Sequence, residues 1–465
     1  MSHTPLRSRL PRVHRRVLHA LLLAFAFALL AGCTAMPSRS TGDAPPPRSQ
    51  HPVIAQASAL LQVGGQVDGS QIDALLSQLD NATLQAEAAA LPVGDPLYNY
   101  VGRALLRRGL PLPRPFDRSA WQFDASNRPP AAADGYRPPL RLAVLLPLSG
   151  ELSKPAAAVR DGFLAGYYGE DRRRPEVRFY DTHGTVGGSL SAYEQAVSAG
   201  NDFVVGPLGR EQVSALFGRP DLPVPILALN RGTVAPPAGN ASFSLSPEDE
   251  GIAAAELLIE RGARRVLVVA GNDDGQRRAV EALRERLGER GAVVTDVVSA
   301  GIADLTPFAQ KEGGIDAVFL AVRGSAAREL MPKLALAGLA GKPKVATSQL
   351  LSDTGKPDED RVLDGIAFPT ESWTSGGYVA GLASDASVAA TLPTARGGAA
   401  RLFAFGYDAW LLTAYLEKLA SSADGHVTGA TGTLRIDGFG NIQRTPAWST
   451  FSGGAPVSLG NAGRR

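Results

Sequence analysis

The chain has 465 residues, and this length predicts two or three folded units, because a single hydrophobic core stops growing well below this size. The composition, 44% hydrophobic and 20% charged, is typical of a globular protein, and a formal net charge of +2 argues against the concentrated basic surface of nucleic-acid-binding proteins. Cys33 is the single cysteine, which excludes a disulfide within the chain.

The N-terminal residues have the pattern of a bacterial signal peptide. Five arginines and no acidic residue precede the run "ALLLAFAFALLA", which is shorter than the about 20 apolar residues that span a bilayer. The "LAGC" that ends this segment resembles the lipobox of bacterial lipoproteins, which implies removal of residues 1–32 and lipidation of Cys33. Thr34, and not aspartate, follows the cysteine, and resemblance to enteric sorting rules then implies an outer-membrane anchor with the protein facing the periplasm. The alternatives are an uncleaved membrane helix and an incidental cysteine.

Three segments that differ in composition and in apolar pattern follow the signal peptide. Residues 33–52 are rich in proline and serine and predict an extended tether. Residues 53–108 show apolar residues three and four apart, which predicts a small helical module with Asp80, Asn81 and Asp95 as helix caps. Residues 109–140 contain seven prolines, which disfavour both helix and strand, so we expect an interdomain linker.

Strand-like and helix-like segments alternate from residue 141, where "RLAVLLPL" has the continuous apolar character of a strand buried on both faces. A capped helix is expected after Ser246, with Glu248, Asp249 and Glu250 in its first turn, where acidic side chains are favourable against the helix dipole. Asp437 and Gly438 predict the turn of a hairpin. The alternation predicts an α/β fold with two lobes over residues 141–455, followed by a disordered tail at 456–465. Further helices are expected at residues 155–168, 189–198, 210–217, 275–290, 325–337 and 401–419.

Sequence signatures of catalysis are missing from the chain. We find no metal-ligand spacing, no nucleophile elbow, no phosphate-binding loop and no S-x-x-K motif, so we expect neither an enzyme nor a bound cofactor. Asp181-Thr182-His183 at a strand end could hold a catalytic pair, and "GNDDG" at 271–275 could bind a cation. For both segments the favoured interpretation is turn and helix-cap chemistry.

Several motifs in the α/β region carry a family resemblance. In chain order these are "LRLAVLLPLSG", "VVGPL", "PILALN", "SLSPEDE" and "VATSQL". Together with the lipobox they resemble the LppC/LpoA family of outer-membrane lipoprotein activators of penicillin-binding proteins, over about residues 140–451. The resemblance implies a two-lobed, type I periplasmic-binding-protein-like domain. It also implies a class A penicillin-binding protein, an inner-membrane peptidoglycan synthase, as the partner that is bound and activated. The helical segment here is much shorter than the helical solenoid of better-known members.

The loops at the carboxyl ends of the strands are where ligands bind in open α/β sheets, and they supply the candidate cleft residues. Receptors of this fold that bind amino acids place hydroxyls on two of these loops, and here only Thr233 offers one, which disfavours an amino acid as the ligand. A lipid-anchored receptor for another small ligand stays open as the alternative function. The candidate cleft-facing or ligand-facing residues are Ser149, Gly150, Gly206, Pro207, Leu208, Asn230, Thr233, Asn272, Asp273, Ser348 and Gln349.

Overall fold

A computed structural model describes residues 51–62, 69–117, 127–422 and 425–459. The predicted signal peptide, Cys33 and most of the tether therefore lie outside the described residues. From Val53 onward the chain belongs to one compact unit, in which we distinguish a helical module and two α/β lobes. No helix within the described ranges combines the length and the apolar character needed to cross a membrane.

The helical module has its own small core, formed by the buried sides of four helices. The carboxylate of Asp80 accepts a hydrogen bond from the backbone N–H of Thr83, and that of Asp95 from the N–H of Leu97, which confirms both as caps. Asn81 is instead the first helical residue after the Asp80 cap. The helices are α2 (Pro52–Gln62), α3 (Gly69–Leu76), α4 (Asn81–Ala90) and α5 (Pro96–Arg107).

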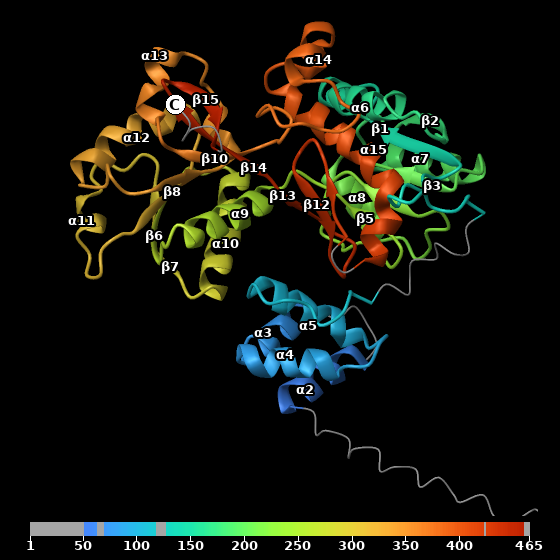
Figure 1. Cartoon of the computed structure of the whole chain (residues 1–465), viewed down its shortest axis with the longest axis horizontal. Coiled ribbons are helices and arrows are strands. Elements are labelled where there is room, and N and C mark those ends of the chain that lie inside the picture. Colours follow the sequence, from blue (N-terminus) through green and yellow to red (C-terminus); the bar gives the residue numbers. More distant parts are fainter. Residues whose placement is uncertain (1–50, 63–68, 118–126, 423–424, 460–465) are drawn as a thin grey trace, which may run out of the picture. The chain divides into compact units, whose positions relative to one another are not determined.

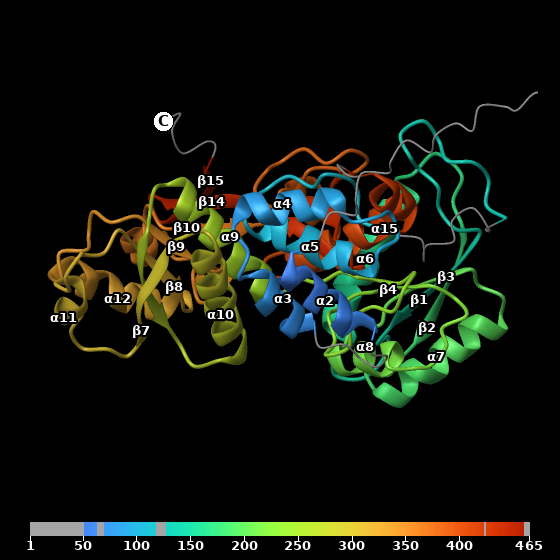
Figure 2. The ribbon, with the colours of Figure 1, turned by 90° about the horizontal axis from the view of Figure 1, so that it is seen from below.

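Lobe 1 is built on a parallel five-stranded sheet of order β2-β1-β3-β4-β5. Figure 2 shows helices on both faces, with α6 and α15 on one and α7 and α8 on the other, and each face has its own apolar cluster. The strands are β1 (Arg141–Leu146), β2 (Glu176–Asp181), β3 (Phe203–Val205), β4 (Ile226–Ala228) and β5 (Ala241–Ser242). The helices are α6 (Ser153–Tyr168), α7 (Val186–Ser198), α8 (Arg210–Phe217) and α15 (Ala399–Ser421).

Lobe 2 has a mixed seven-stranded sheet of order β15-β14-β10-β9-β8-β6-β7 (Figure 1). β14 runs antiparallel to both of its neighbours, β10 and β15, and the other neighbouring pairs are parallel. Separate apolar clusters lie against α9 with α10 and against α12. The strands are β6 (Arg265–Ala270), β7 (Val293–Ser299), β8 (Ala317–Ala321), β9 (Lys344–Ala346), β10 (Ala367–Thr370), β14 (Ala447–Ser452) and β15 (Ala455–Ser458). The helices are α9 (Pro247–Glu260), α10 (Asp274–Glu289), α11 (Thr306–Ala309), α12 (Gly324–Leu336) and α13 (Pro357–Asp360).

Three segments connect the lobes. Residues 243–246 lead from β5 to α9, residues 371–398 lead from β10 to α15, and Pro446 joins a small three-stranded sheet to β14. That sheet consists of β11 (Val427–Thr428), β12 (Thr433–Ile436) and β13 (Ile442–Thr445), and the second segment contains α14 (Asp385–Thr391). The hairpin predicted at Asp437 is confirmed, with a five-residue loop between β12 and β13.

The two-lobed α/β prediction is confirmed, with corrections at its edges. The strand expected over "KVATSQLL" ends at Ala346, and a 3₁₀ turn follows at Ser348–Leu351. Residues 456–458, which we expected in a disordered tail, pair with β14 as β15. Tyr136, in the predicted linker, is buried in the lobe 1 core, and its hydroxyl donates to the carbonyl of Arg173 at 2.8 Å. The boundaries at residues 108 and 140 stay predictions.

Candidate functional site

Most of the predicted lobe 1 residues form tight turns. A Cβ added at Gly206 would lie 2.1 Å from the carbonyl oxygen of Leu145, so a larger residue at this strand end would displace the backbone. The loop beside it is joined internally, because Asn230 Nδ2 donates to the carbonyl of Leu208 at 2.8 Å. Thr233 is engaged by α8, since its backbone N–H donates to Ser214 Oγ at 2.8 Å. Gly206 to Leu208 and Asn230 therefore lie together, while Thr233 hydrogen-bonds elsewhere.

Ser149 meets the Asp181-Thr182-His183 turn. Ser149 Oγ lies 2.9 Å from His183 Nδ1, and the same nitrogen lies 3.2 Å from Asp181 Oδ2. A nucleophile–base–carboxylate relay needs the two ring nitrogens to face different partners, and here one nitrogen contacts both. Asp181 Oδ1 also accepts the backbone N–H of Leu148 and that of His183, and Gly150 adopts φ +80°, so the group has the contacts of a βα turn.

The lobe 2 candidates fall into two small groups. Asp273 caps α10 by accepting the N–H of Gln276 at 2.8 Å, and Gln276 Nε2 in turn donates to Gln349 Oε1 at 2.7 Å. The structure therefore brings Asp273 and Gln349 together, and Asn272 contributes its backbone carbonyl to a long contact with Arg277. Ser348 belongs to a different group, because both its N–H and its hydroxyl donate to the carboxylate of Glu250, at 2.8 and 2.7 Å.

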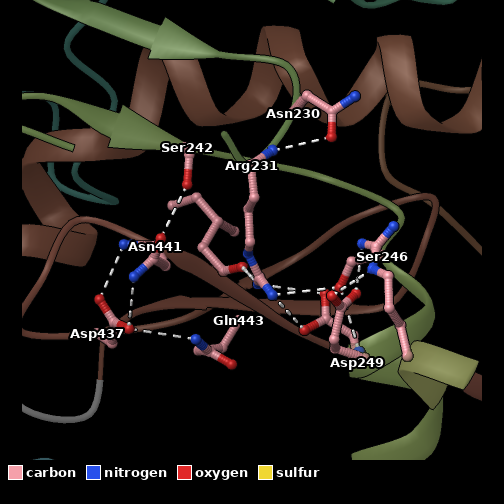
Figure 3. Close-up of polar contacts among 11 residues, drawn as sticks. Asn230, Arg231, Ser242, Ser246, Asp249, Asp437, Asn441 and Gln443 are labelled. Atoms are coloured by element: carbon pink, nitrogen blue, oxygen red, sulfur yellow. Dashed lines mark hydrogen bonds and ion pairs between the residues drawn. The ribbon is translucent and has the colours of Figure 1, made fainter. Parts of the chain in front are cut away.

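Two consecutive carboxylates at the start of α9 tie lobe 2 to lobe 1. Successive helical residues point about 100° apart, so Asp249 and Glu250 reach different partners. Asp249 pairs with Arg231, which follows β4, at 2.8 Å, and Ser246 caps the helix beside it (Figure 3). Glu250 pairs with Arg401, on α15, at 2.6 Å. Both carboxylates are almost wholly buried, and the positive end of the helix dipole also favours them.

Arg401 also pairs with Glu371, in the second connecting segment, at 3.1 Å, and Arg444 at the end of β13 is buried in the same region. We call Arg231, Asp249, Glu250, Glu371, Arg401 and Arg444 the interlobe charge cluster. Burial raises the pKa of Glu250, but the guanidinium of Arg401 and the hydrogen bonds from Ser348 outweigh it and bring the pKa below its ordinary value. Burial lowers the pKa of Arg401, but Glu250 and Glu371 more than offset this. Both members of this pair are therefore held in their charged forms.

The cluster was not predicted from the sequence. Asp249 and Glu250 were interpreted only as residues that complement a helix dipole, and Arg401 only as the start of a helix. The one available signal was the "SPEDE" motif, which places three acids in one turn. A pocket of about 780 Å³ adjoins the cluster, lined among others by Ser348, Gln349 and Arg401. Among the described residues, no group of three histidine or carboxylate side chains is arranged to hold a metal ion.

Asp408 is a buried carboxyl group on α15, C-terminal to Arg401 of the cluster in the same helix. Asp408 accepts hydrogen bonds from the N–H of Ala430 at 2.5 Å, and from the N–H and the hydroxyl of Thr431 at 2.8 and 2.5 Å. Burial raises the pKa of Asp408 to about 7, against the lowering effect of these hydrogen bonds. The folded protein therefore holds a proton that the unfolded chain, with an ordinary aspartate pKa of about 4, releases.

We expect the free energy of unfolding to carry an Asp408 contribution that is present below about pH 4 and is lost as the pH rises to about 7. Asp408→Asn removes this titration while conserving shape. Between about pH 5 and pH 7.5, urea denaturation should show the wild type losing about 2 kcal/mol relative to the variant. Parallel pH profiles for the two proteins would show that Asp408 is ionised throughout.

Two α/β lobes joined by three connecting segments define a type I periplasmic-binding-protein-like domain. Within that class the chain belongs to the LppC family, whose model, described as "LppC putative lipoprotein", matches residues 136–297 and 298–454. This confirms the family resemblance seen in the sequence.

Known relatives and solved structures agree with this membership. The penicillin-binding protein activator LpoA of Pasteurella multocida is 26% identical over 327 residues, which are 69% of this chain and 55% of that protein. The chain spans about half the length of the curated relatives it matches. The C-domain of LpoA (YraM) from Haemophilus influenzae, a regulator of PBP1A, shares the fold with TM-score 0.60 and 23% identity, over 69% of this chain and 99% of that chain. A "putative branched-chain amino acid ABC transporter" from Chromobacterium violaceum matches with TM-score 0.55 and 28% identity, over 67% of this chain and all of the other.

Proposed function

We propose that this protein is an outer-membrane lipoprotein that binds a class A penicillin-binding protein and activates peptidoglycan synthesis. The names of the relatives support the partner and the regulatory role. The observation that carries the mechanism is the ion pair between Glu250 and Arg401 at 2.6 Å. A receptor could use the guanidinium of Arg401 to bind a ligand carboxylate, but here a carboxylate of lobe 2 is already paired with it. The lack of nucleophile, metal-ligand and phosphate-binding motifs in the sequence further favours action by binding over catalysis.

Activation by binding requires that the protein prefer the active conformation of the synthase, because only differential affinity shifts a population. A tenfold preference corresponds to about 1.4 kcal/mol, which a few interface side chains supply. The test mixes the purified lipidated protein with a class A synthase and its lipid-linked precursor. We expect faster polymerisation or crosslinking, and no reaction with precursor alone. Binding without a rate change would reduce the role to a scaffold, and precursor turnover without the synthase would make the protein an enzyme.

The anchor can be tested separately. Cys33→Ser removes the thiol that accepts the diacylglycerol, and stable membrane attachment needs more than one acyl chain. We expect the variant to leave the outer-membrane fraction, either as a soluble periplasmic protein or as an uncleaved precursor, when the envelope is fractionated and probed by immunoblot. A variant that stays in the outer membrane as the wild type does would contradict lipidation at Cys33.

A lipid-anchored receptor for a small ligand is the second candidate. It is favoured by the 28% identity to the Chromobacterium violaceum protein and by the pocket of about 780 Å³ beside Arg401. A ligand that binds only the folded protein raises its melting temperature by mass action. Thermal denaturation in the presence of pooled small metabolites, with amino acids as one pool among several, therefore separates the two candidates. A rise of several degrees, lost in Ser348→Ala, would support the receptor.

A further inference from the structure

A second pocket, of about 580 Å³, is lined by residues of α5, α9, β13 and β14, and it shares no lining residue with the pocket beside Arg401. We call it the α5–α9 pocket. Its volume lies within the range of about 300–1,000 Å³ typical of small-molecule sites. Its larger apolar lining residues are Leu106, Phe116, Ile252, Leu257, Pro446 and Trp448. Much of the wall therefore suits an apolar ligand.

Arg444, on β13, is a buried cation that lines the α5–α9 pocket. Only 6% of its surface is exposed, and its Nε has no hydrogen-bond partner in the described parts of the chain. Its Nη1 donates to the carbonyl of Thr431 at 3.2 Å, but the guanidinium makes no ion pair with any residue that the structure describes. Burial lowers the pKa of Arg444, and Arg401 lowers it further, which the acids of the interlobe charge cluster offset only in part.

The interlobe charge cluster leaves Arg444 without an ion pair because its acids are already engaged. Its other two arginines, Arg231 and Arg401, contact its three carboxylates at distances between 2.6 and 3.1 Å. A buried donor without an acceptor is costly, and a charged acceptor placed in the pocket removes that cost. A carboxylate matches the planar guanidinium, which can donate two parallel hydrogen bonds to it. Arg444 therefore favours an anionic group on the ligand.

The acids that line the same pocket limit the charge of that ligand. Glu256 pairs with Arg286 at 3.3 Å, and Asp437 accepts hydrogen bonds from the side-chain amides of Asn441 and Gln443 at 3.1 and 3.3 Å (Figure 3). Five carboxylates and four guanidiniums line the pocket in all. Like charges brought close together repel, so a dianion such as phosphate is disfavoured here and a single carboxylate is the better match for Arg444.

We propose that the α5–α9 pocket binds a monocarboxylate with an apolar body. The guanidinium of Arg444 pairs with the ligand carboxylate, and Ile252, Leu257 and Trp448 contact the apolar body. Fatty acids and peptides with an apolar C-terminal residue both present this chemistry. The binding does not involve the synthase, so it and the proposed activation can each fail alone.

The experiment uses the purified full-length protein and two pairs of probes, in which the members of each pair differ in the charge of one end group. One pair is octanoate and octanamide, and the other is N-acetyl-leucyl-leucine and its amide. By isothermal titration calorimetry, we expect at least one acid to bind at least tenfold more tightly than its amide, and the pair that shows this identifies the source of the ligand. Arg444→Met should weaken that acid about tenfold and leave the amide unchanged. Arg277→Met, at an exposed arginine, is the control and should change neither.

A second variant tests the same pocket without removing a buried charge. Ala253 is half-buried on α9 and lines the pocket, so the ring in Ala253→Phe fills space that the ligand needs. We expect this variant to lose binding of the acid. Ala335→Phe, at an exposed position of α12, is the matched control and should bind as the wild type does.

Each other outcome overturns the proposal. Failure of both acids to bind at millimolar concentration removes the site, and equal affinities of acid and amide in both pairs remove the role of the carboxylate. Unchanged affinity in Arg444→Met or in Ala253→Phe places the binding elsewhere. If Arg444→Met does not fold, the difference between acid and amide and its loss in Ala253→Phe decide the result.

Discussion

Replacing Arg401 with methionine should lower the free energy of unfolding by about 3 kcal/mol and loosen the contact between the lobes. The side chains of Glu250 and Glu371 are only 5% and 7% exposed, so the substitution leaves two buried carboxylates without their cation. Removing one partner of a buried pair is strongly destabilising for this reason, whereas exposed pairs contribute little. Urea denaturation measures the loss. Hydrogen exchange at the amide of Ser348, which donates to Glu250, should become faster.

Two further variants distinguish this effect from a general loss of an arginine. Arg277→Met removes an exposed pair with Asp274, in which both side chains are about 65% exposed, and should cost less than about 0.5 kcal/mol. Adding Glu250→Gln to Arg401→Met removes one of the stranded charges, so the double variant should be more stable than the sum of the single effects predicts. Additive losses would show that the two residues are not coupled.

The parts of the fold that local pattern determines were predicted well. α8 was predicted at residues 210–217 and has those bounds, and β1 begins at Arg141, where the apolar run begins. Elements whose stability comes from distant partners were missed. β15 has only four residues, and its order comes from pairing with β14. α14 is a seven-residue helix without buried residues, so its sequence carried no periodic apolar signal.

The interlobe charge cluster was missed for the same physical reason. Glu250 and Arg401 are 151 positions apart, and nothing in the local sequence around either residue indicates the other. The dipole argument for Glu250 was locally correct, since it does lie in the first turn of α9. Its burial depends on how the lobes meet, which is a property of the tertiary structure. The tight turn at Gly206 was easier to predict from the sequence, because its positive φ of 102° favours glycine.

The second large effect is expected at the crossing of α6 and α15, where the helix backbones approach each other through glycines. A Cβ at Gly406 would lie 1.9 Å from the carbonyl oxygen of Val159, and one at Gly162 would lie 1.9 Å from that of Phe403. Gly406→Ala must therefore separate two helices that form the core of lobe 1. Overpacking of this kind costs about 1–3 kcal/mol, occasionally more, and we expect a loss of about 3 kcal/mol.

Gly406→Ala is expected to change the free energy of unfolding in the direction opposite to that of an ordinary glycine-to-alanine substitution in a helix. In a helix interior, alanine is ordinarily about 1 kcal/mol more favourable than glycine, so without the close approach Gly406→Ala would stabilise the protein. Gly288, in α10, is the matched control, because nothing lies within 4 Å of a Cβ built there. Gly288→Ala should raise the free energy of unfolding by up to about 1 kcal/mol while Gly406→Ala lowers it, both measured by urea denaturation. If both alanines stabilise, α6 and α15 do not cross at the distance described, because a Cβ at Gly406 would then fit without displacing the backbone of α6.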